Sequence, residues 1–259
     1  MTTLSAMTLR VASLLMEVTK GSAQTGTATT LVDAIQLTKG NQYFDRGTLW
    51  MLTGSHAGEV FFVTKHYGNK LTIDSVNPAI AVGDGYAVAR AVYPHDQLVS
   101  AINLALTDTF IVKEAISAPP ADILGDGTTL KFDIPDGFSR VVRVELEHPT
   151  DETQVYESAH FRERDGQIIF DSGYPPSTGW KIHIYTRQDH PDLVDYDDQI
   201  NEQIRESWLK WKAVEHALYW AVGSYGAAND YRIEERLNRA MQELKTLRPR
   251  DPLVMMHAG

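Results

Sequence analysis

The sequence predicts an α+β fold, in which a helical core carries a small N-terminal β-barrel-like block and a β-sandwich-like insertion. Two observations favour this class. Apolar residues recur every three or four positions near residues 7–18, 94–109 and 200–247, which is the spacing of one helix face. Short β-type runs separated by turn residues occupy much of the remaining chain. We therefore expect four parts, which are residues 1–94, residues 95–116 together with 188–248, residues 117–187, and a tail at 249–259.

The first part begins with a short helix over Met7–Val18, whose apolar stripe consists of Val11, Leu14, Leu15 and Val18. A charge-free loop rich in Gly, Ser, Thr and Ala follows at residues 21–30. Short β-type runs separated by turns make up the rest of this part. They cover Thr29–Val32, Gly47–Thr53, Glu59–Thr64, Lys70–Asp74 and Tyr86–Arg90. Strands at this spacing are typical of a small barrel or a rolled antiparallel sheet.

A second helix is expected to start at Pro94, because proline fits the first turn of a helix and lacks the hydrogen that would go unpaired there. Asp96 lies in the first turn, where the helix dipole favours a negative charge. One face of this helix carries Leu98, Ile102, Ala105 and Thr109. The two prolines of Ala118-Pro119-Pro120 end it.

A second β-rich block is expected over residues 128–187. Asp165-Gly166 is typical of a two-residue hairpin turn, which would join Phe161–Arg164 to Gln167–Phe170. Phe138–Leu146 alternates in part between apolar and charged side chains, as a half-buried strand does. The last strand is expected at Trp180–Tyr185, because Trp180, Ile182 and Ile184 fall on one face.

The last third of the chain predicts two helices. A long helix capped by Asp197 or Asp198 carries a stripe that continues to Val222. The stripe consists of Ile200, Ile204, Trp208, Trp211, Glu215, Leu218 and Val222. Residues 223–229 break the pattern, and a narrower stripe follows on a second helix at Ile233, Leu237, Ala240, Leu244 and Leu247. Arg248-Pro249-Arg250-Asp251-Pro252 ends that helix and leaves a short tail.

Composition excludes several classes of protein. The chain has no cysteine, which rules out disulfides, a cysteine nucleophile and cysteine-ligated metals. Its net charge of −10 argues against a protein that coats nucleic acid. The charge is uneven, with a net of +1 in residues 1–94, −7 in residues 95–187 and −4 in residues 188–259. No apolar run approaches the ~18 residues of a membrane helix, and Met1–Leu9 lacks the pattern of a signal peptide.

Catalytic motifs are almost absent. The sequence contains neither the phosphate-binding loop of nucleotide hydrolases nor the glycine pattern of dinucleotide-binding folds. Val222-Gly223-Ser224-Tyr225-Gly226 lacks the first glycine of a serine-hydrolase elbow, and Glu157 with His160 is a single pair without a second copy. We therefore expect no enzyme, no catalytic residue, no cofactor and no metal ligand.

Five acids occur within ten residues at Asp189, Asp192, Asp195, Asp197 and Asp198. The favoured interpretation is an acidic linker whose last aspartates cap the helix that follows. A calcium site is an alternative, since Ca²⁺ prefers oxygen ligands. A metal-dependent hydrolase that combines this cluster with a distant histidine is a further alternative.

The long C-terminal helix concentrates aromatic residues at Trp208, Trp211, Tyr219 and Trp220. Such rings could stack on single-stranded nucleic acid, but the neighbouring charges are mixed rather than basic. Trp208 and Trp211 continue the apolar stripe, which favours packing in the core or against another subunit. Tyr219 and Trp220 lie off that stripe, and this suggests that the helix is covered on more than one side by a partner subunit.

Two stretches of the chain combine glycines, turn residues and alternating strands. The first stretch contains Gly21-Ser22-Ala23, Thr29–Asp33, Gly47–Trp50, Gly58, Val63-Thr64, Leu71-Thr72, Gly83–Tyr86 and Leu98–Leu106. The second contains Gly127-Thr128, Ile134-Pro135, Arg140–Val144 and Gly179-Trp180, and then enters the helix at Ile200. Together they cover most of residues 9–222, and they resemble head-to-tail adaptor, or neck, proteins of tailed bacteriophages.

The resemblance implies a homo-oligomeric ring, of about twelve copies by analogy with such adaptors, built on a helical connector core between the portal protein and a tail or stopper protein. DNA would pass through the ring without specific binding during genome ejection. By position in the chain, Leu253, Val254, Met255 and Met256 would contact the portal. The protein would be made in the cytoplasm of the bacterial host and would reside in the virion neck. The alternative is another phage tail or baseplate structural protein whose β modules bind the host surface.

Overall fold

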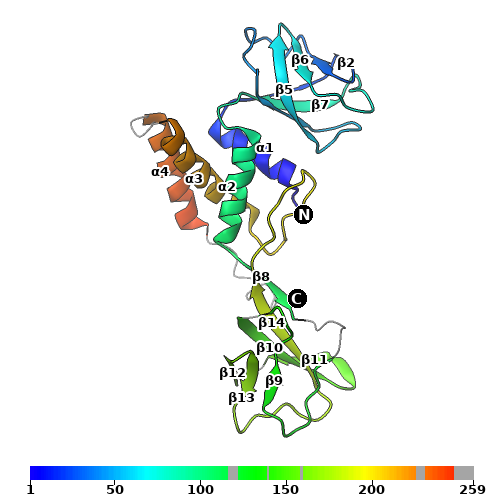
Figure 1. Cartoon of the computed structure of the whole chain (residues 1–259), viewed down its shortest axis with the longest axis vertical. Helices are drawn as coiled ribbons and strands as arrows, with labels where there is room; N and C mark the ends of the chain where they lie inside the picture. Colours follow the sequence, from blue (N-terminus) through cyan, green and yellow to red (C-terminus); the bar gives the residue numbers. More distant parts are fainter. Residues whose placement is uncertain (116–121, 139, 158–159, 226–230, 248–259) are drawn as a thin grey trace. The chain divides into compact units, whose positions relative to one another are not determined.

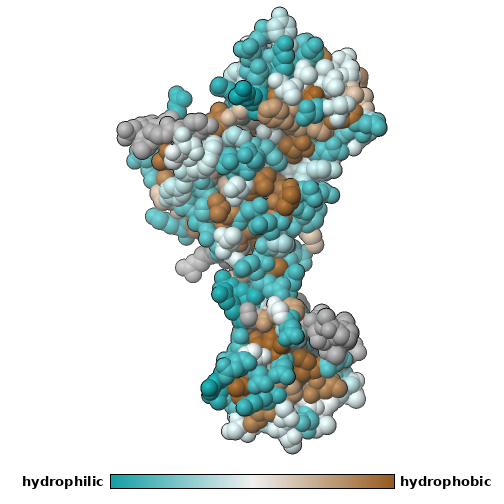
Figure 2. Space-filling model, viewed as in Figure 1, coloured by the Kyte–Doolittle hydropathy of each residue, from teal (hydrophilic) through white to brown (hydrophobic). Residues whose placement is uncertain are grey.

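The computed structural model describes residues 1–115, 122–138, 140–157, 160–225 and 231–247, and it has the predicted α+β fold (Figure 1). The chain forms two compact units. Among the described residues, the first combines Met1–Thr109 with residues 191–247, and the second is built from Phe110–His190. The four-part division expected from the sequence is finer than this grouping and stays a prediction. In Figure 2, hydrophilic residues cover much of the visible surface of each unit, and hydrophobic residues form separate patches.

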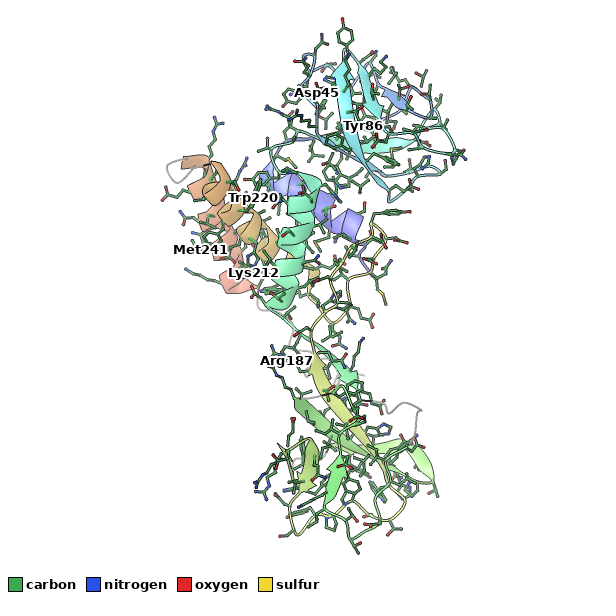
Figure 3. The ribbon with its side chains drawn as sticks, viewed as in Figure 1. Asp45, Tyr86, Arg187, Lys212, Trp220 and Met241 are labelled. Atoms are coloured by element: carbon green, nitrogen blue, oxygen red, sulfur yellow. The ribbon has the colours of Figure 1, made fainter. Side chains whose placement is uncertain are left out.

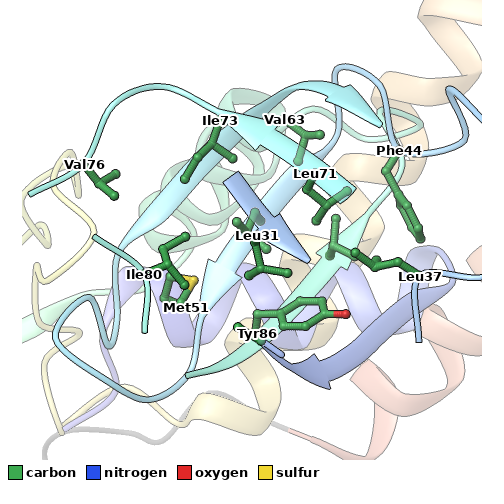
Figure 4. Close-up of a cluster of buried hydrophobic side chains, with 13 residues drawn as sticks. Leu31, Leu37, Phe44, Met51, Val63, Leu71, Ile73, Val76, Ile80 and Tyr86 are labelled. Atoms are coloured by element: carbon green, nitrogen blue, oxygen red, sulfur yellow. The ribbon is translucent and has the colours of Figure 1, made fainter. Parts of the chain in front are cut away.

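The first unit contains a curled antiparallel sheet of seven strands in the order β1-β7-β4-β5-β6-β3-β2. Its concave side holds a core that includes Leu31, Val63, Leu71 and Tyr86 (Figure 4). The short β-type runs expected between residues 29 and 90 are confirmed as β3 to β7. The strands are β1 (Val18–Ser22), β2 (Thr25–Gly26), β3 (Thr30–Val32), β4 (Thr48–Met51), β5 (Val60–Tyr67), β6 (Lys70–Ile73) and β7 (Gly85–Ala89).

A buried carboxylate organises this core. Asp33 is 2% exposed, and its Oδ1 accepts hydrogen bonds from the backbone nitrogens of Ile35 and Gln36 at 2.8 and 3.1 Å. Its Oδ2 accepts a hydrogen bond from the Tyr86 hydroxyl at 2.9 Å. Burial, followed by this contact with Asp33, raises the pKa of Tyr86 far above its usual value, so the phenol stays a donor.

Four helices complete the first unit, and Figure 1 shows them gathered in one group. They are α1 (Leu4–Leu15), α2 (His95–Thr107), α3 (Glu206–Tyr225) and α4 (Tyr231–Thr246). The predicted start of α2 is confirmed, since Pro94 is its N-cap and Asp96 lies in its first turn. Helix α1 is joined to the sheet where Trp50 Nε1 donates to Thr8 Oγ1 at 3.1 Å. The helix α3 packs against α1, α2 and α4.

Several helix boundaries differ from the prediction. The helix α2 ends at Thr107 rather than at Ala118-Pro119-Pro120, because Ile111–Glu114 forms strand β8 and pairs with β14 (Lys181–Gln188). The first helix ends at Leu15 rather than Val18, because Val18 begins β1 and pairs with Ala89 of β7. The helix α3 begins at Glu206 rather than near Ile200, because the Ile200 nitrogen donates to the Thr2 carbonyl at 3.0 Å in extended pairing. Neither Asp197 nor Asp198 therefore caps α3. Asp198 Oδ2 accepts instead from the backbone nitrogens of Val194 and Asp195 at 2.6 and 2.8 Å.

The second unit contains a four-stranded antiparallel sheet, β11-β10-β14-β8, and a three-stranded sheet, β12-β13-β9. Val144, Ile182 and Ile184 of the larger sheet share a core with Ile168 and Phe170 of the smaller one. The predicted hairpin is confirmed, with Asp165 and Gly166 at φ of 53° and 73° in its turn. The strands are β8 (Ile111–Glu114), β9 (Lys131–Asp133), β10 (Val141–His148), β11 (Asp151–Glu157), β12 (Phe161–Arg164), β13 (Gln167–Phe170) and β14 (Lys181–Gln188).

Candidate assembly surface

The helix α3 is the element on which the aromatic side chains singled out in the sequence are displayed. Trp208 and Trp211 are 6% and 7% exposed, so most of their surface is covered within this chain. Tyr219 is 52% exposed, and Trp220 is partly buried. The other helices of the unit therefore cover much of the aromatic surface, and Tyr219 is the member of the set that remains open to a partner.

Two of these rings join helices of the first unit. Trp220 lies 6.2 Å from the ring of Tyr93, which is 3% exposed and comes just before the start of α2. The Trp211 ring lies 5.5 Å from Lys210 Nζ and 5.6 Å from Arg239 Cζ of α4. Cations near an indole ring are attracted to its negative face, so Trp211 helps to hold α4 against α3.

A surface groove of about 490 Å³ lies between the last turns of α4 and the first half of α3. Figure 3 shows Lys212 on α3 and Met241 on α4, two of the side chains that line it. Its apolar lining comes from Trp208, Met241 and Leu244. Its charged lining comes from Asp108, Lys212, Glu215 and Lys245. We call this feature the α3–α4 groove.

Lys212 organises the charged side of the α3–α4 groove. Its Nζ lies 3.2 Å from Asp108 Oδ2, just after α2, and 2.7 Å from Glu215 Oε2. Burial lowers the pKa of Lys212, but hydrogen bonds to Glu215 and Asp108 outweigh it and raise the pKa above the usual value. His216 adds a contact from Nε2 to Asp108 Oδ2 at 3.3 Å. The ammonium is thus held protonated between two carboxylates and pins α2 to α3.

This chemistry suits the binding of a polypeptide segment. The apolar lining of such a groove can bury the aliphatic side chains of a bound segment. Its charged rim can form hydrogen bonds with the backbone of that segment. A lysine whose pKa is raised is a poor general base, because it holds its proton at neutral pH. Among the described side chains, no group of three or more His, Asp and Glu is arranged to hold a metal ion.

No family model, curated protein or solved structure matches this chain. Its function has to be inferred from its own residues. The described helices include none that is both long and apolar enough to cross a membrane.

The remaining predicted site residues have different outcomes. Leu253, Val254, Met255 and Met256 lie outside the described residues. The assignment of Trp208, Trp211, Tyr219 and Trp220 to subunit packing stays a prediction. In the acidic segment, Asp198 is used to cap a turn, as its contacts with Val194 and Asp195 show.

Sequence reasoning did not identify the α3–α4 groove. Asp108 and Lys212 are more than one hundred positions apart, so no local pattern links them. Two local signals were available, namely the ion pair of Lys212 with Glu215 three residues later and the position of Met241 beside the predicted stripe of α4. A cluster of Glu114, His183 and Glu147 in the second unit was missed for the same reason.

Proposed function

We propose that this protein is a structural virion protein of a tailed bacteriophage, a head-to-tail adaptor. In this proposal it forms a homo-oligomeric ring, a dodecamer, between the portal and the tail. The ring continues the channel through which the genome leaves the head. The protein is not an enzyme and uses no cofactor. It works in the neck of the virion after synthesis in the bacterial host cytoplasm.

The observation that carries the proposal is that the helical group is assembled from separate parts of the chain. Its helices come from the N-terminus, the middle and the last third of the chain, and β structure is inserted between them. The helical group is similar to the helical core typical of the adaptors that the sequence resembles, and the β structure is an addition to that pattern. In this proposal α1, α2, α3 and α4 form the helical connector core, strands β1 to β7 form a β-barrel-like block, and the strands of the second unit, β8 to β14, form a β-sandwich-like insertion.

The distribution of charge supports a channel that DNA passes without being bound. All of the net negative charge comes from residues after 94. Carboxylates that face a lumen repel phosphates over roughly a Debye length, which is ~8 Å at physiological ionic strength. We propose that much of this charge lines the ring.

Partners follow from the same proposal. Neighbouring copies contact each other through different surfaces, since a closed ring of this type is heterologous. Tyr219 of α3 is 52% exposed and is proposed to lie in that contact. Leu253–Met256 is proposed to reach the portal protein, and a tail or stopper protein binds the opposite end.

Electron microscopy of the purified protein, alone and mixed with its portal, tests this function. A ring with a central hole, in which individual copies can be counted, is the expected result. A stable monomer that binds neither portal nor tail components would overturn the proposal. Gold-labelled antibody against the protein should mark the neck of intact virions.

One observation favours the alternative of a tail or baseplate protein that binds the host surface. In the second unit the Trp180 ring lies 5.7 Å from that of Tyr156, which is 52% exposed, and 5.2 Å from that of His148. Exposed aromatic rings beside polar groups are suited to sugar recognition. Binding to host glycans on an array, lost in Tyr156→Ala, together with a normal neck in virions lacking the protein, would favour this alternative.

A further inference from the structure

Two neighbouring segments of the first unit form a surface without exposed charge. They are residues 22–36, which include β2 and β3, and residues 75–83, which lie between β6 and β7. The Gly83 nitrogen donates to the Ala23 carbonyl at 2.8 Å, and the Val76 nitrogen donates to the Ala28 carbonyl at 2.7 Å. Because these bonds join the two segments, we treat them together and call them the uncharged surface.

The composition of the uncharged surface is typical of the centre of an interface. Every exposed residue in the two segments is neutral, although Asp, Glu, Lys and Arg make up 22% of the chain. Ile35 and Val82 are large aliphatic residues that are 69% and 73% exposed. Depletion of charged residues distinguishes the centre of a protein–protein contact from the rest of a protein surface, and exposed apolar side chains that gather there mark such a contact.

Charged residues occur at the margin of the uncharged surface, and their signs are mixed. They are Lys20, Lys39, Glu59, Lys70, Asp74 and Asp84. Lys70 pairs with Val32 in the sheet, and Glu59 Oε2 lies 2.9 Å from Nδ1 of His56, whose Nε2 donates to the Pro78 carbonyl at 2.6 Å. A neutral centre within a polar rim is the arrangement found in protein–protein contacts.

Two buried carboxylates hold the exposed aliphatic residues of this surface in place. Asp33 is 2% exposed, and its Oδ1 accepts a hydrogen bond from the Ile35 nitrogen at 2.8 Å. Asp84 is 7% exposed, and its Oδ2 accepts a hydrogen bond from the Ala81 nitrogen, next to Val82, at 2.8 Å. Both turns are therefore ordered before a partner binds, which reduces the entropy that association would cost.

Electrostatics favours a second copy of this chain as the partner. Each copy carries a net charge of −10, so two copies repel each other. The repulsion is smallest for a contact within residues 1–94, whose net charge is +1, and through a surface that exposes no carboxylate. A basic partner would instead be recognised by exposed acids, and the two segments of the uncharged surface offer none.

We propose that the uncharged surface binds a neighbouring copy of this chain, with Ile35 and Val82 as its aliphatic anchors. Burial of these two side chains removes apolar area from water and stabilises the contact. The neighbour contributes a different surface, because contacts in a closed ring of this type are heterologous. The heterologous form of the contact rests on the proposed function, whereas the use of this surface for self-association does not.

The absence of cysteine permits a direct test in the full-length protein. Ile35→Cys and Val82→Cys each place one thiol on the uncharged surface. Leu104→Cys is the matched control, because Leu104 is an aliphatic residue of α2 that is 50% exposed. Each variant is treated with a maleimide below and above the concentration at which it self-associates, as defined by sedimentation velocity. We expect the first two thiols to react ~10 times more slowly in the assembled protein, and the control thiol to react equally fast in both states.

A charge at either anchor provides a second readout. Ile35→Asp and Val82→Asp should each weaken self-association at least ~10-fold, because a carboxylate would be buried without a partner. Leu104→Asp should leave self-association unchanged. Circular dichroism confirms that the three variants fold.

The outcomes separate the contact from the proposed function. Thiols at the two anchors that react equally fast in assembled and dissociated protein would overturn the contact. Protection that appears only when purified portal protein is added, or a chain that binds the portal but stays monomeric, would exclude a second copy as the partner and leave the adaptor function standing. Protection in a dimer or an open filament, with no closed ring in electron micrographs, would overturn the adaptor function and leave the contact standing.

Discussion

Nε2 of His183 on β14 lies 2.7 Å from Oε2 of Glu147 on the neighbouring strand β10. On the other side of the same ring, Nδ1 lies 2.5 Å from Oε1 of Glu114 on β8. An ionised carboxylate only accepts hydrogen bonds, so both ring nitrogens must donate and the ring is an imidazolium. One cation thereby joins three strands of the second unit. In the pairing of β10 with β14, Glu145 lies opposite His183, and Lys181 lies opposite Glu147.

The His183 cluster makes stability depend on pH. Burial lowers the pKa of His183, but the hydrogen bonds to Glu114 and Glu147 outweigh it and raise the pKa above 6.5. A raised folded-state pKa means that the stabilisation is complete below about pH 6.5 and is lost as the pH rises through the folded value. We expect His183→Gln to lower the free energy of unfolding by about 1 kcal/mol at pH 6 and by less at pH 9.

Urea unfolding of wild type and His183→Gln at both pH values measures this difference. Comparing the two proteins at each pH isolates the contribution of His183, because the rest of the sequence is identical. A difference that grows between pH 6 and pH 9 would contradict the imidazolium assignment.

The hydrogen bond from Tyr86 to Asp33 predicts a cost for removing one hydroxyl. In Tyr86→Phe the ring stays in the core, but a buried carboxylate loses one of its three donors. We expect the free energy of unfolding to fall by about 1–3 kcal/mol, as for a buried polar group left short of a partner. Tyr67→Phe, at a hydroxyl-bearing ring that is 62% exposed, should change it by less than about 0.5 kcal/mol. Equal effects in chemical denaturation would contradict the role given to Asp33.

Gly21 on β1 lies against Asp33 and Tyr86, and adding a side chain there is expected to cause a steric clash. A Cβ at this position would lie 2.3 Å from Asp33 Oδ2 and 2.8 Å from the Tyr86 hydroxyl. Gly21→Ala should therefore lower the thermal midpoint by several degrees, since overpacking costs about 1–3 kcal/mol. Gly40→Ala is the matched control, because a Cβ added at Gly40 would meet no atom within 4 Å. A midpoint unchanged in Gly21→Ala would show that the strand shifts freely at this point.

The proposed ring predicts an effect of a charge at Tyr219. Tyr219→Asp should weaken self-association at least ~30-fold, because an aromatic centre of an interface contributes about 2 kcal/mol or more. Tyr67→Asp, at a ring of β5 that is 62% exposed, should assemble as the wild type does. Sedimentation velocity reports both, and circular dichroism confirms that the variants fold. Loss of rings in both variants, or in neither, would remove Tyr219 from the contact.

Elements that depend on neighbouring residues were predicted well from the sequence. The helix α2 begins directly after Pro94, which is its N-cap, and Asp165-Gly166 makes the hairpin because both residues accept a positive φ. The β-type runs between residues 29 and 90 follow from their alternation and turns. These features need no information from distant parts of the chain.

Features that depend on distant residues were missed. The start of α3 is delayed because Ile200 pairs with Thr2, almost two hundred positions earlier. The strand β1 was not predicted: Val18 was expected to end a helix, and Gly21 and Ser22 were expected in a loop. The stability of β1 comes from pairing with β7 rather than from its own composition. The α3–α4 groove and the His183 cluster likewise join residues that only the fold brings together.

The second unit is attached through two chain segments that lie side by side. Where the chain enters and leaves the second unit, Ile111 of β8 pairs directly with Gln188 of β14. In the first unit, the Asn103 side chain of α2 donates to the Leu193 carbonyl at 2.9 Å and accepts from the Leu193 nitrogen at 3.0 Å. The entry and exit points are thus close together on both sides of the connection. The second unit can therefore be replaced by another module or by a short turn. The two chain ends in the first unit stay close together, so its helices need not move.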